Sequence, residues 1–437
     1  MNQKQIIAIA VVAVVVIAGV AAYLTLGGGE DSEKIESKLP VYGNANNDYV
    51  IDNKDIGVME KIIKGELSAS DYPLADADRS GGVTQADIDL AKKLIAGEKT
   101  QATIIDQQGD EITLAYPLDN IVPINADMVL FTVCFGASDK VAAYVSGSYP
   151  VVLSCLEDSV LLNSGRSLTA SGWTKLMELD GELNKKGSSI GAVFVDRDTA
   201  AGDYIGALET AKIPLINIRC TDPELSLDGT LLMGFVMGKE TEKVSIEYVA
   251  DSENALNYLA DKIEGKSKVP FLALNMINSV AGIKSQYTLI GIAAGGDPKT
   301  TVSGNSSSKL ADTEAIMAYD KIIDAILNFG TMDCVNADPK GYWDPKEDSR
   351  ISFLEKSEHF EDMVYINLSM PITCRVIYAA SVLYPDQISA DYALDFHQKM
   401  VDKYMSYLNE TQEDGDMDVR KDMTTIMTYQ DYLDSKA

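Results

Sequence analysis

The segment that most constrains the fold runs from residue 239 to residue 265 and contains no proline, and no glycine before its last residue. Apolar residues recur along it at helical spacing, at Val249, Leu256, Leu259 and Ile263. A single helix of this length would be about 40 Å long. We therefore expect one long, rigid helix here, leading into a new strand.

Short apolar runs alternate with helical patterns on both sides of this segment, which is typical of parallel sheets covered by helices. We expect a β-hairpin over 102–116, strands at 121–124, 141–145, 190–195, 213–218, 269–274 and 363–366, and helices at 126–136, 171–185, 199–211, 311–327 and 372–383. The pattern predicts an α/β protein of two lobes, at 100–238 and 267–437, joined by a long rigid inter-lobe helix at 239–266, with a cleft between the lobes.

Composition excludes several classes of protein. The 437 residues include 66 acidic and 37 basic side chains, a net charge of −29, whereas nucleic-acid binders carry a basic face. The apolar fraction of 46% argues against bulk disorder. The chain has only two histidines, His359 and His397, which leaves little material for a His-rich zinc site or a histidine-based triad.

The N-terminus carries an uncharged run of 21 residues, Ile6 to Leu26. As a helix it would span about 31 Å, close to the thickness of a bilayer core. Lys4 precedes it and acidic residues follow, which predicts that the body lies outside the cytoplasm. We expect a transmembrane anchor in 1–29, a linker at 30–40 and localisation at the cell membrane; a cleaved signal peptide is the alternative.

Two segments, 44–66 and 76–98, resemble one another at an offset of 32 residues. Each begins with oxygen-bearing side chains at loop positions 1, 3, 5, 9 and 12 and continues as an apolar helix pattern. That spacing suits a calcium loop, in which a backbone carbonyl at position 7 adds a ligand. The predicted calcium ligands are Asn44, Asn46, Asp48, Val50, Asp52 and Asp55 in loop one (44–55), and Asp76, Asp78, Ser80, Gly82, Thr84 and Asp87 in loop two (76–87).

This duplication resembles the dockerin domain, an EF-hand-like pair of calcium loops each followed by one helix, and we assign it to residues 41–99. The resemblance implies calcium as cofactor and a cohesin module as partner, contacted by Asn53-Lys54 and Gln85-Ala86. Loop one has Asn44 in place of the usual Asp and Tyr49 in place of a turn-forming Gly, so we expect it to bind calcium more weakly. Two acidic surface turns are the alternative.

Residues 100–405 resemble the substrate-binding proteins of the cobalamin and iron–siderophore class of ABC importers. The matching pieces, in order, are Ile121-Val-Pro-Ile-Asn125, Phe135-Gly-Ala-Ser-Asp-Lys140, a Gly-Gly-ended helix in 288–297, Met363-Val-Tyr-Ile-Asn367, and Thr373 to Pro385. The resemblance implies the helical-backbone metal-chelate binding fold, preceded here by the transmembrane and dockerin-like segments. It also implies a binding protein, not an enzyme, which passes cobalamin, haem or a ferric siderophore to a membrane permease.

The same resemblance implies that an acidic residue on each lobe contacts the permease. Glu314 matches in the second lobe. In the first lobe the expected position near Trp173 lacks a glutamate, and Glu178, one turn further along, is the candidate substitute. The alternative is that both are ordinary carboxylates of a helix surface.

Ligand-binding residues are expected beyond the carboxyl ends of strands and in neighbouring loops. Arg375 suits anionic ligand groups, and aromatic rings could stack on a flat macrocycle. The candidates are Asn125, Tyr144, Ser146, Tyr149, Lys284, Gln286, Tyr287, Tyr342, Trp343 and Arg375, each with a packed or merely exposed side chain as the alternative.

Two other functions remain open. The chain could be a cell-surface scaffold or adhesion protein, assembled through dockerin–cohesin contacts, whose lobes no longer bind a transported ligand. An enzyme such as a chelatase is disfavoured, because no nucleophile motif or clustered metal-ligating pair is present. The acidic tail, 408–437, has no assigned role.

Overall fold

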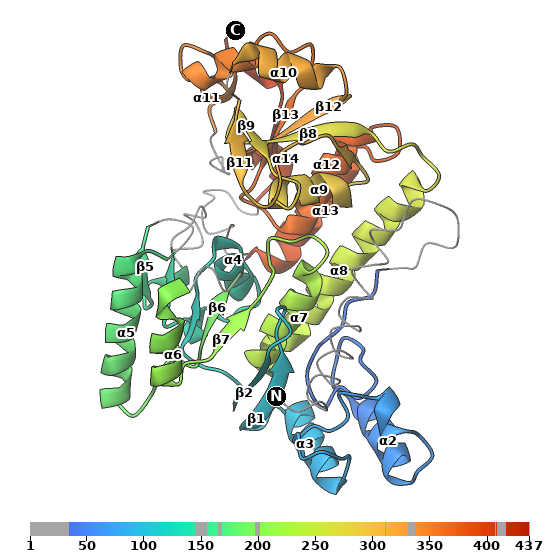
Figure 1. The fold of residues 1–437 in the computed structure, drawn as a ribbon, viewed down its shortest axis with the longest axis vertical. Helices are drawn as coiled ribbons and strands as arrows, with labels where there is room; N and C mark the ends of the chain where they lie inside the picture. The colour runs from blue at the N-terminus through green and yellow to red at the C-terminus, as the bar shows by residue number, and fades with distance from the viewer. Residues whose placement is uncertain are drawn as a thin grey trace. The chain divides into compact units, whose positions relative to one another are not determined.

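The structure, a computed structural model, describes residues 35–145, 155–164, 168–196, 202–310, 312–330, 337–406, 408 and 417–436. The chain divides into two compact units (Figure 1). Unit 1 contains the described residues up to Cys220 together with 224–253, and unit 2 contains 221–223 and the described part of 254–437.

The predicted transmembrane run, Ile6 to Leu26, lies outside the described residues. Across the described ranges between residues 35 and 436, none of the helices combines the length and the apolar character needed to cross a bilayer.

The repeated segments fold as two helices that lie side by side, α2 (Asn53–Ile63) and α3 (Gln85–Ala96) (Figure 1). Asp52 caps the first helix and Thr84 the second, each within a capping box whose N3 member is an aspartate. Their facing sides bury a small apolar cluster of Ala45, Met59, Ala75, Ala77, Ile88 and Ala91. The 32-residue sequence repeat is therefore also a structural repeat, which we call the repeat module (residues 41–99).

The repeat module is joined to the antiparallel hairpin of β1 (Thr100–Ile105) and β2 (Glu111–Tyr116). The Tyr42 amide donates to the Thr103 carbonyl at 2.9 Å, and the Ile105 amide donates to the Pro40 carbonyl at 2.8 Å. Just before this pairing, the amides of Ser37 and Lys38 donate to the carboxylates of Glu253 and Asp228. The described part of the predicted linker is thus held against unit 1.

The rest of unit 1 contains parallel strands, as expected from the alternating pattern. β6 (Ala192–Val195) lies between β3 (Ile121–Pro123) and β7 (Leu215–Asn217), and β4 (Ala143–Val145) pairs with β5 (Val160–Asn163). A parallel bridge from Ile121 to Val141 connects the two sets. The accompanying helices are α4 (Ala126–Cys134), α5 (Ala170–Lys185), α6 (Ile205–Ala211) and α7 (Ser226–Val236).

The predicted long helix is confirmed as α8 (Lys239–Ile263). It ends before Gly265, whose positive φ of 70° is readily adopted by glycine. The boundary between the two compact units falls inside this helix, between Glu253 and Asn254.

Unit 2 is built on a seven-stranded mixed sheet. Its strand order is β11 (Ser307–Lys309), β9 (Ser279–Ala281), β8 (Pro270–Asn275), β12 (Ala325–Gly330), β13 (Val364–Asn367) and β14 (Ile426–Met427), with β10 (Asp297–Pro298) also paired to β8. The central strands β8, β12 and β13 are parallel. Side chains of these central strands, including Leu272, Ile326 and Tyr365, belong to a large apolar core.

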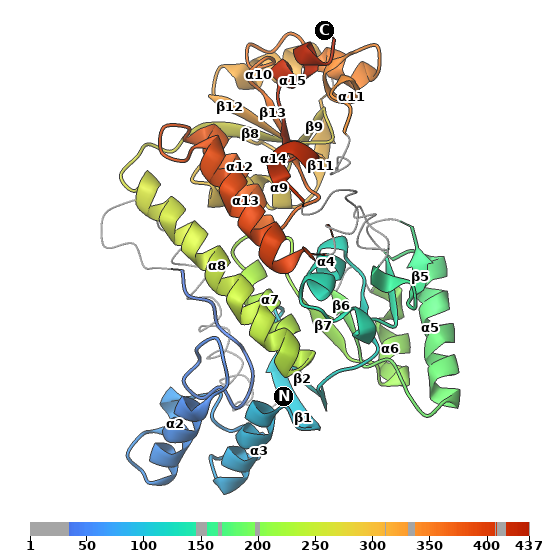
Figure 2. The same ribbon diagram turned by 180° about the vertical axis from the view of Figure 1, so that it is seen from behind.

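Helices cover both faces of the unit 2 sheet (Figures 1 and 2). One face carries α9 (Gln286–Ala293), α12 (Ile372–Leu383) and α13 (Ala390–Tyr404); the other carries α10 (Thr313–Asp320), α11 (Lys340–Trp343) and α15 (Tyr429–Asp434). The short helix α14 (Val419–Asp422) packs near α13.

One sequence prediction in unit 2 is wrong. The sequence predicts a helix at 311–327, but the structure has the shorter helix α10 there. Residues 325–327, at the end of the predicted helix, belong to the central strand β12. The apolar run Ala325-Ile-Leu is short enough to suit either structure, and its neighbours β8 and β13 decide the outcome by pairing with it on both sides.

Candidate functional site

The two loops of the repeat module share their backbone geometry. In loop one, the Asn46 amide donates to Asp55 Oδ1 at 3.0 Å; in loop two, the Asp78 amide donates to Asp87 Oδ1 at the same distance. Position 4 is left-handed in both, with φ of 56° at Asn47 and 59° at Arg79. The position-12 aspartates therefore both close the loop and cap the following helix.

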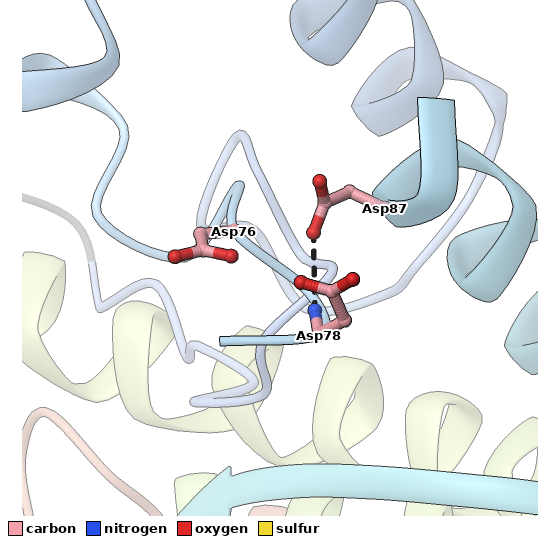
Figure 3. A group of neighbouring side chains, drawn as sticks. All are labelled: Asp76, Asp78 and Asp87. Carbon is pink, nitrogen blue, oxygen red and sulfur yellow. Dashed lines mark hydrogen bonds between the residues drawn. The ribbon is translucent and has the colours of Figure 1, made fainter. Parts of the chain in front are cut away.

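Loop two gathers three carboxylates, from Asp76, Asp78 and Asp87 (Figure 3). One oxygen from each lies within 4.8 Å of the others. Within the ranges described between 35 and 436, this is the one group of three or more acidic, His or Cys side chains that could share a metal ion. Oxygen donors at this spacing suit a hard cation such as calcium.

The electrostatics of loop two follow from its burial and its hydrogen bonds. Burial raises the pKa of Asp76 above its usual range, against the lowering effect of the Gly81 amide, which donates to Asp76 Oδ2 at 2.8 Å. Hydrogen bonding to Ser80 lowers the pKa of Asp78. Gly81, at position 6, has φ of +102°, a conformation that a side chain would strain.

Loop one is stabilised differently. The Asn44 side chain is fully buried, and its amide nitrogen donates to the carbonyls of Leu39 and Asp48 at 2.8 and 2.6 Å, while its Oδ1 has no partner. The side-chain amide of Asn46, Nδ2, donates to the Asp48 carboxylate at 2.8 Å. The Lys54 ammonium lies 3.8 Å from Asp48 and 3.5 Å from Asp52. Amide and ammonium donors thus already compensate its carboxylates.

Where the sequence of loop one departs from the calcium pattern, its backbone and its charges also differ from those of loop two. Tyr49 stands where loop two has Gly81, and it is not among the residues with positive φ. Lys54 stands where loop two has Ala86, so loop one places an ammonium group at position 11, within 4 Å of Asp48 and Asp52, and loop two has no cation at that position. Burial also raises the pKa of Asp55 to about 6. Loop two therefore fits a calcium ion better than loop one.

Of the predicted ligand residues of unit 1, one follows the end of a strand, one lies within a strand, and two fall outside the described residues. Asn125 follows β3 and caps α4, accepting from the Asp127 amide at 2.8 Å. Tyr144 is a buried member of β4. Ser146 and Tyr149 fall outside the described residues.

In unit 2, three candidates gather at the start of α9. Lys284 is exposed, and Gln286 and Tyr287 open the helix. The Tyr287 ring lies 5.8 Å, centroid to centroid, from the ring of Phe329, near the carboxyl end of β12. Sequence reasoning did not single out the neighbouring Ser285 and Thr288, although serine directly before an apolar helix is a recognisable capping signal.

Trp343 does not suit the stacking role predicted for it. It is 1% exposed and packs edge-on against Phe360, Tyr365 and Tyr429 inside the unit 2 core. Tyr342 is half-buried and contacts Tyr365. The sequence predicts an exposed aromatic loop at Tyr342 and Trp343. In the structure, Tyr429 of the C-terminal segment packs on Trp343 and helps to bury it.

Arg375 is also buried, at 1% exposure, on α12. The two predicted permease contacts, by contrast, are both exposed. Glu178 lies on α5 of unit 1, and Glu314 lies in the first turn of α10 of unit 2. Their exposure is compatible with docking and equally with an ordinary solvated helix face.

No protein-family model matches the chain, and no curated protein sequence matches it.

Comparison with solved structures identifies the fold. A TroA-like periplasmic binding protein, FepB from Veillonella parvula, shares 13% sequence identity with a TM-score of 0.55, over 75% of this chain and 99% of that one. The chain has the TroA-like periplasmic binding protein fold. An ABC transporter solute binding protein from Sulfurospirillum deleyianum (12% identity, TM-score 0.51, 69% and 98% covered) shares it. The molybdate periplasmic binding protein MolA from Haemophilus influenzae shares it too, with 16% sequence identity and a TM-score of 0.51 over 70% of this chain and 98% of that one.

The predicted localisation needs correction. A body held at the cell membrane by an N-terminal helix is contradicted, because no described helix could span a bilayer and the structures of similar fold are periplasmic binding proteins. The fold prediction is confirmed at the level of the α/β binding-protein fold.

Proposed function

We propose that this protein is the substrate-binding component of an ABC importer and captures a metal or a metal chelate. The observation that carries the proposal is the fold match, which takes in nearly the whole length of the solute-binding proteins compared. The names of those proteins describe them as periplasmic or solute-binding proteins. Haem, a corrinoid and a ferric siderophore are the chelates that we propose to test first.

The proposal is tested by the spectrum and the thermal stability of the full chain. A bound haem, corrinoid or ferric chelate absorbs visible light where the polypeptide does not, and a ligand that binds only the folded state raises the melting temperature. We expect one of these chelates, or molybdate, to raise it in a concentration-dependent way. Failure of all four to do so in protein stripped of ligand would count against the proposal.

We also propose that loop two binds calcium. Asp76, Asp78 and Asp87 would supply carboxylate oxygens, Ser80 and Thr84 hydroxyl oxygens, and Gly82 a backbone carbonyl. The ion would neutralise carboxylates that otherwise repel one another at short range. Loop one, with Lys54 beside its acidic residues, is proposed as the weaker site.

Calorimetric titration of the full chain, after treatment with a chelator, tests the calcium proposal. Asp76→Asn keeps the shape of the side chain but removes a charged ligand, so we expect calcium affinity to fall at least about tenfold. Asp89→Asn, on an exposed position of α3 outside the loop, is the matched control and should bind as the parent does. Absence of calcium uptake by the parent would remove the proposal.

Two partners follow from these proposals. Glu178 and Glu314 are proposed to contact a permease, since both are exposed on helices of different units. The exposed residues that open α2 and α3 are proposed as a docking surface for a cohesin-like module: Asn53, Lys54, Gln85 and Ala86. Charge-reversed glutamate variants with unchanged ligand binding but reduced transport would support the permease contact.

A further inference from the structure

The amino-terminal end of helix α9 in unit 2 lacks a side-chain cap. Ser285 occupies the N-cap position with extended backbone angles, yet its side chain makes no capping hydrogen bond. The first amide groups of any α-helix have no partner within the helix. They carry partial positive charge, which makes such an end suited to an anion.

Two buried hydroxyl groups belong to the same end of this helix and have no hydrogen-bond partner. Ser285 is 2% exposed and Thr288 is fully buried, and the hydroxyl oxygen of each is unpaired. The two residues are three positions apart, so their side chains lie on one face of the first turn. Unpaired buried hydroxyls are destabilising, and a ligand oxygen that accepts from them would satisfy both.

The loop that leads into α9 is held in place by its own backbone. The amides of Gly282, Ile283 and Lys284 donate to the carbonyls of Ser306, Val302 and Gly304, each at 2.9 Å. A side chain at Gly282 would collide with the Gly304 carbonyl at 2.4 Å, so the close approach of these strands requires glycine. The backbone that leads into the N-cap is thus held in place before any ligand arrives, which lowers the entropy lost on binding.

The position of this helix end within unit 2 is one where α/β proteins bind ligands. Tyr287, in the first turn, contacts Phe329 of β12, which is paired with Asn275, the last residue of β8. The first turn of α9 therefore lies at the carboxyl edge of the central parallel strands.

The local charge also favours an anion. Lys284 directly precedes the N-cap and is exposed, and the first turn of α9 contains no acidic residue. The net charge of the whole chain, −29, makes this arrangement a local exception to the overall acidity.

We propose that the amino-terminal end of α9 binds an oxyanion, with the hydroxyls of Ser285 and Thr288 and the first-turn amides donating to its oxygens and Lys284 balancing its charge. The proposal deepens the proposed function and depends on it: the captured ligand is an oxoanion such as molybdate, or a chelate that carries carboxylate groups. Because both hydroxyls are covered in this structure, the ligand oxygen reaches them by displacing the atoms that cover them.

The test uses the full chain, with sodium molybdate, sodium phosphate and ferric citrate as probes in calorimetric titration. Molybdate and phosphate represent free oxoanions, and ferric citrate represents a carboxylate-bearing chelate. We expect at least one probe to bind, and Thr288→Val to weaken its binding about tenfold, since a hydrogen bond to a charged group is lost. The matched control is Ser381→Ala, which removes a buried hydroxyl of unit 2 that is already paired with the Tyr378 carbonyl at 2.8 Å.

Ligand-free stability gives a second readout that a purely structural role would not produce. Thr288→Val removes an unpaired hydroxyl, so the melting temperature of the ligand-free variant should equal or exceed that of the parent. Ser381→Ala should lower it. Unchanged binding of the probes by Thr288→Val, or binding of none of them by a parent that binds haem or a corrinoid, would overturn the oxyanion site and leave the proposed function standing. A parent that binds no probe of either kind would overturn both.

Discussion

Arg79 of loop two and Glu111 of β2 form a two-point ion pair, with Nη2 lying 2.6 and 2.8 Å from the two carboxylate oxygens. The guanidinium also lies over the Tyr42 ring, 4.3 Å from its centroid, and the Tyr42 hydroxyl donates to Glu111 at 2.7 Å. Loop one has Asn47 at the equivalent position, so only loop two is connected to the hairpin in this way. The predicted calcium site is thereby tied to the first lobe.

Replacing Arg79 with alanine should lower the free energy of unfolding by about 1 kcal/mol. The guanidinium contacts both carboxylate oxygens and stacks on the Tyr42 ring, but both side chains of the ion pair are more than a third exposed, which limits the loss. Urea unfolding of the full chain measures the loss. Lys185→Ala, which breaks an equally short but more exposed pair with Glu182, should cost less. If Arg79→Ala and Glu111→Gln are additive in the double variant, the two side chains are not coupled.

Lys54 should weaken calcium binding by loop one, since its ammonium lies within 4 Å of two candidate ligands. We expect Lys54→Ala to raise the affinity of the weaker site about two- to fivefold, the range of an exposed ion pair. Lys64→Ala removes a similar exposed pair beyond the loop and is the control. Calorimetry of both variants checks this; weaker calcium binding by Lys54→Ala would contradict it.

Trp343 should matter for stability and not for direct stacking on a ligand. Truncation to alanine leaves a large cavity among Phe360, Tyr365 and Tyr429, and should cost about 3–5 kcal/mol. Far-UV circular dichroism during urea unfolding measures this. Trp343→Phe should lose less. A fully stable Trp343→Ala variant that no longer binds its chelate would instead favour the stacking role.

Ending the chain at Thr425, which removes residues 426–437, should destabilise unit 2, although these residues end an acidic tail. Met427 and Tyr432 are buried, and β14 pairs with Tyr365 and Ile366 of β13. Loss of these two buried side chains should cost about 3–5 kcal/mol. Hydrogen exchange at β13 should become faster in the shortened chain. Parent-like protection there would show that β14 contributes little.

The stability of unit 1 should depend on the protonation of Asp228. Burial raises the pKa of this carboxyl to about 6, while the hydrogen bond from the Lys38 amide and the charge of Lys38 oppose the shift and Glu253 adds to it. The folded protein therefore holds this proton more tightly than the unfolded chain, whose carboxyl has a pKa near 3.9. Its contribution to stability is complete below about pH 4 and is lost as the pH rises to about 6.

The Asp228→Asn variant cannot titrate and isolates this contribution. The free energy of unfolding of the parent, relative to that of the variant, should fall by about 2–3 kcal/mol between pH 4 and pH 7. Unfolding at four pH values in this range measures it, with the exposed Asp89→Asn as control. A difference that does not change with pH would show that Asp228 has an ordinary pKa.

The sequence alone determined the features that depend on local periodicity and capping. Helix α12 occupies the predicted residues, 372–383, and the long helix ends two residues before its predicted end. The repeated loops were recognisable because oxygen-bearing side chains recur at a fixed offset of 32 residues. The structure adds that Asp52 and Asp55, and likewise Thr84 and Asp87, form the capping boxes of α2 and α3. These signals act over a few residues and therefore survive without tertiary information.

Only the tertiary structure decided what depends on distant partners. β12 is a strand because β8 and β13 pair with both of its edges, and Trp343 is buried because Tyr429, more than eighty residues later, packs on it. The buried, unpaired hydroxyls of Ser285 and Thr288 are likewise invisible in a sequence, since burial and the absence of a donor or acceptor are properties of the surroundings. Local propensity is fixed by neighbouring residues, whereas solvent exclusion is fixed by chain segments far apart in sequence.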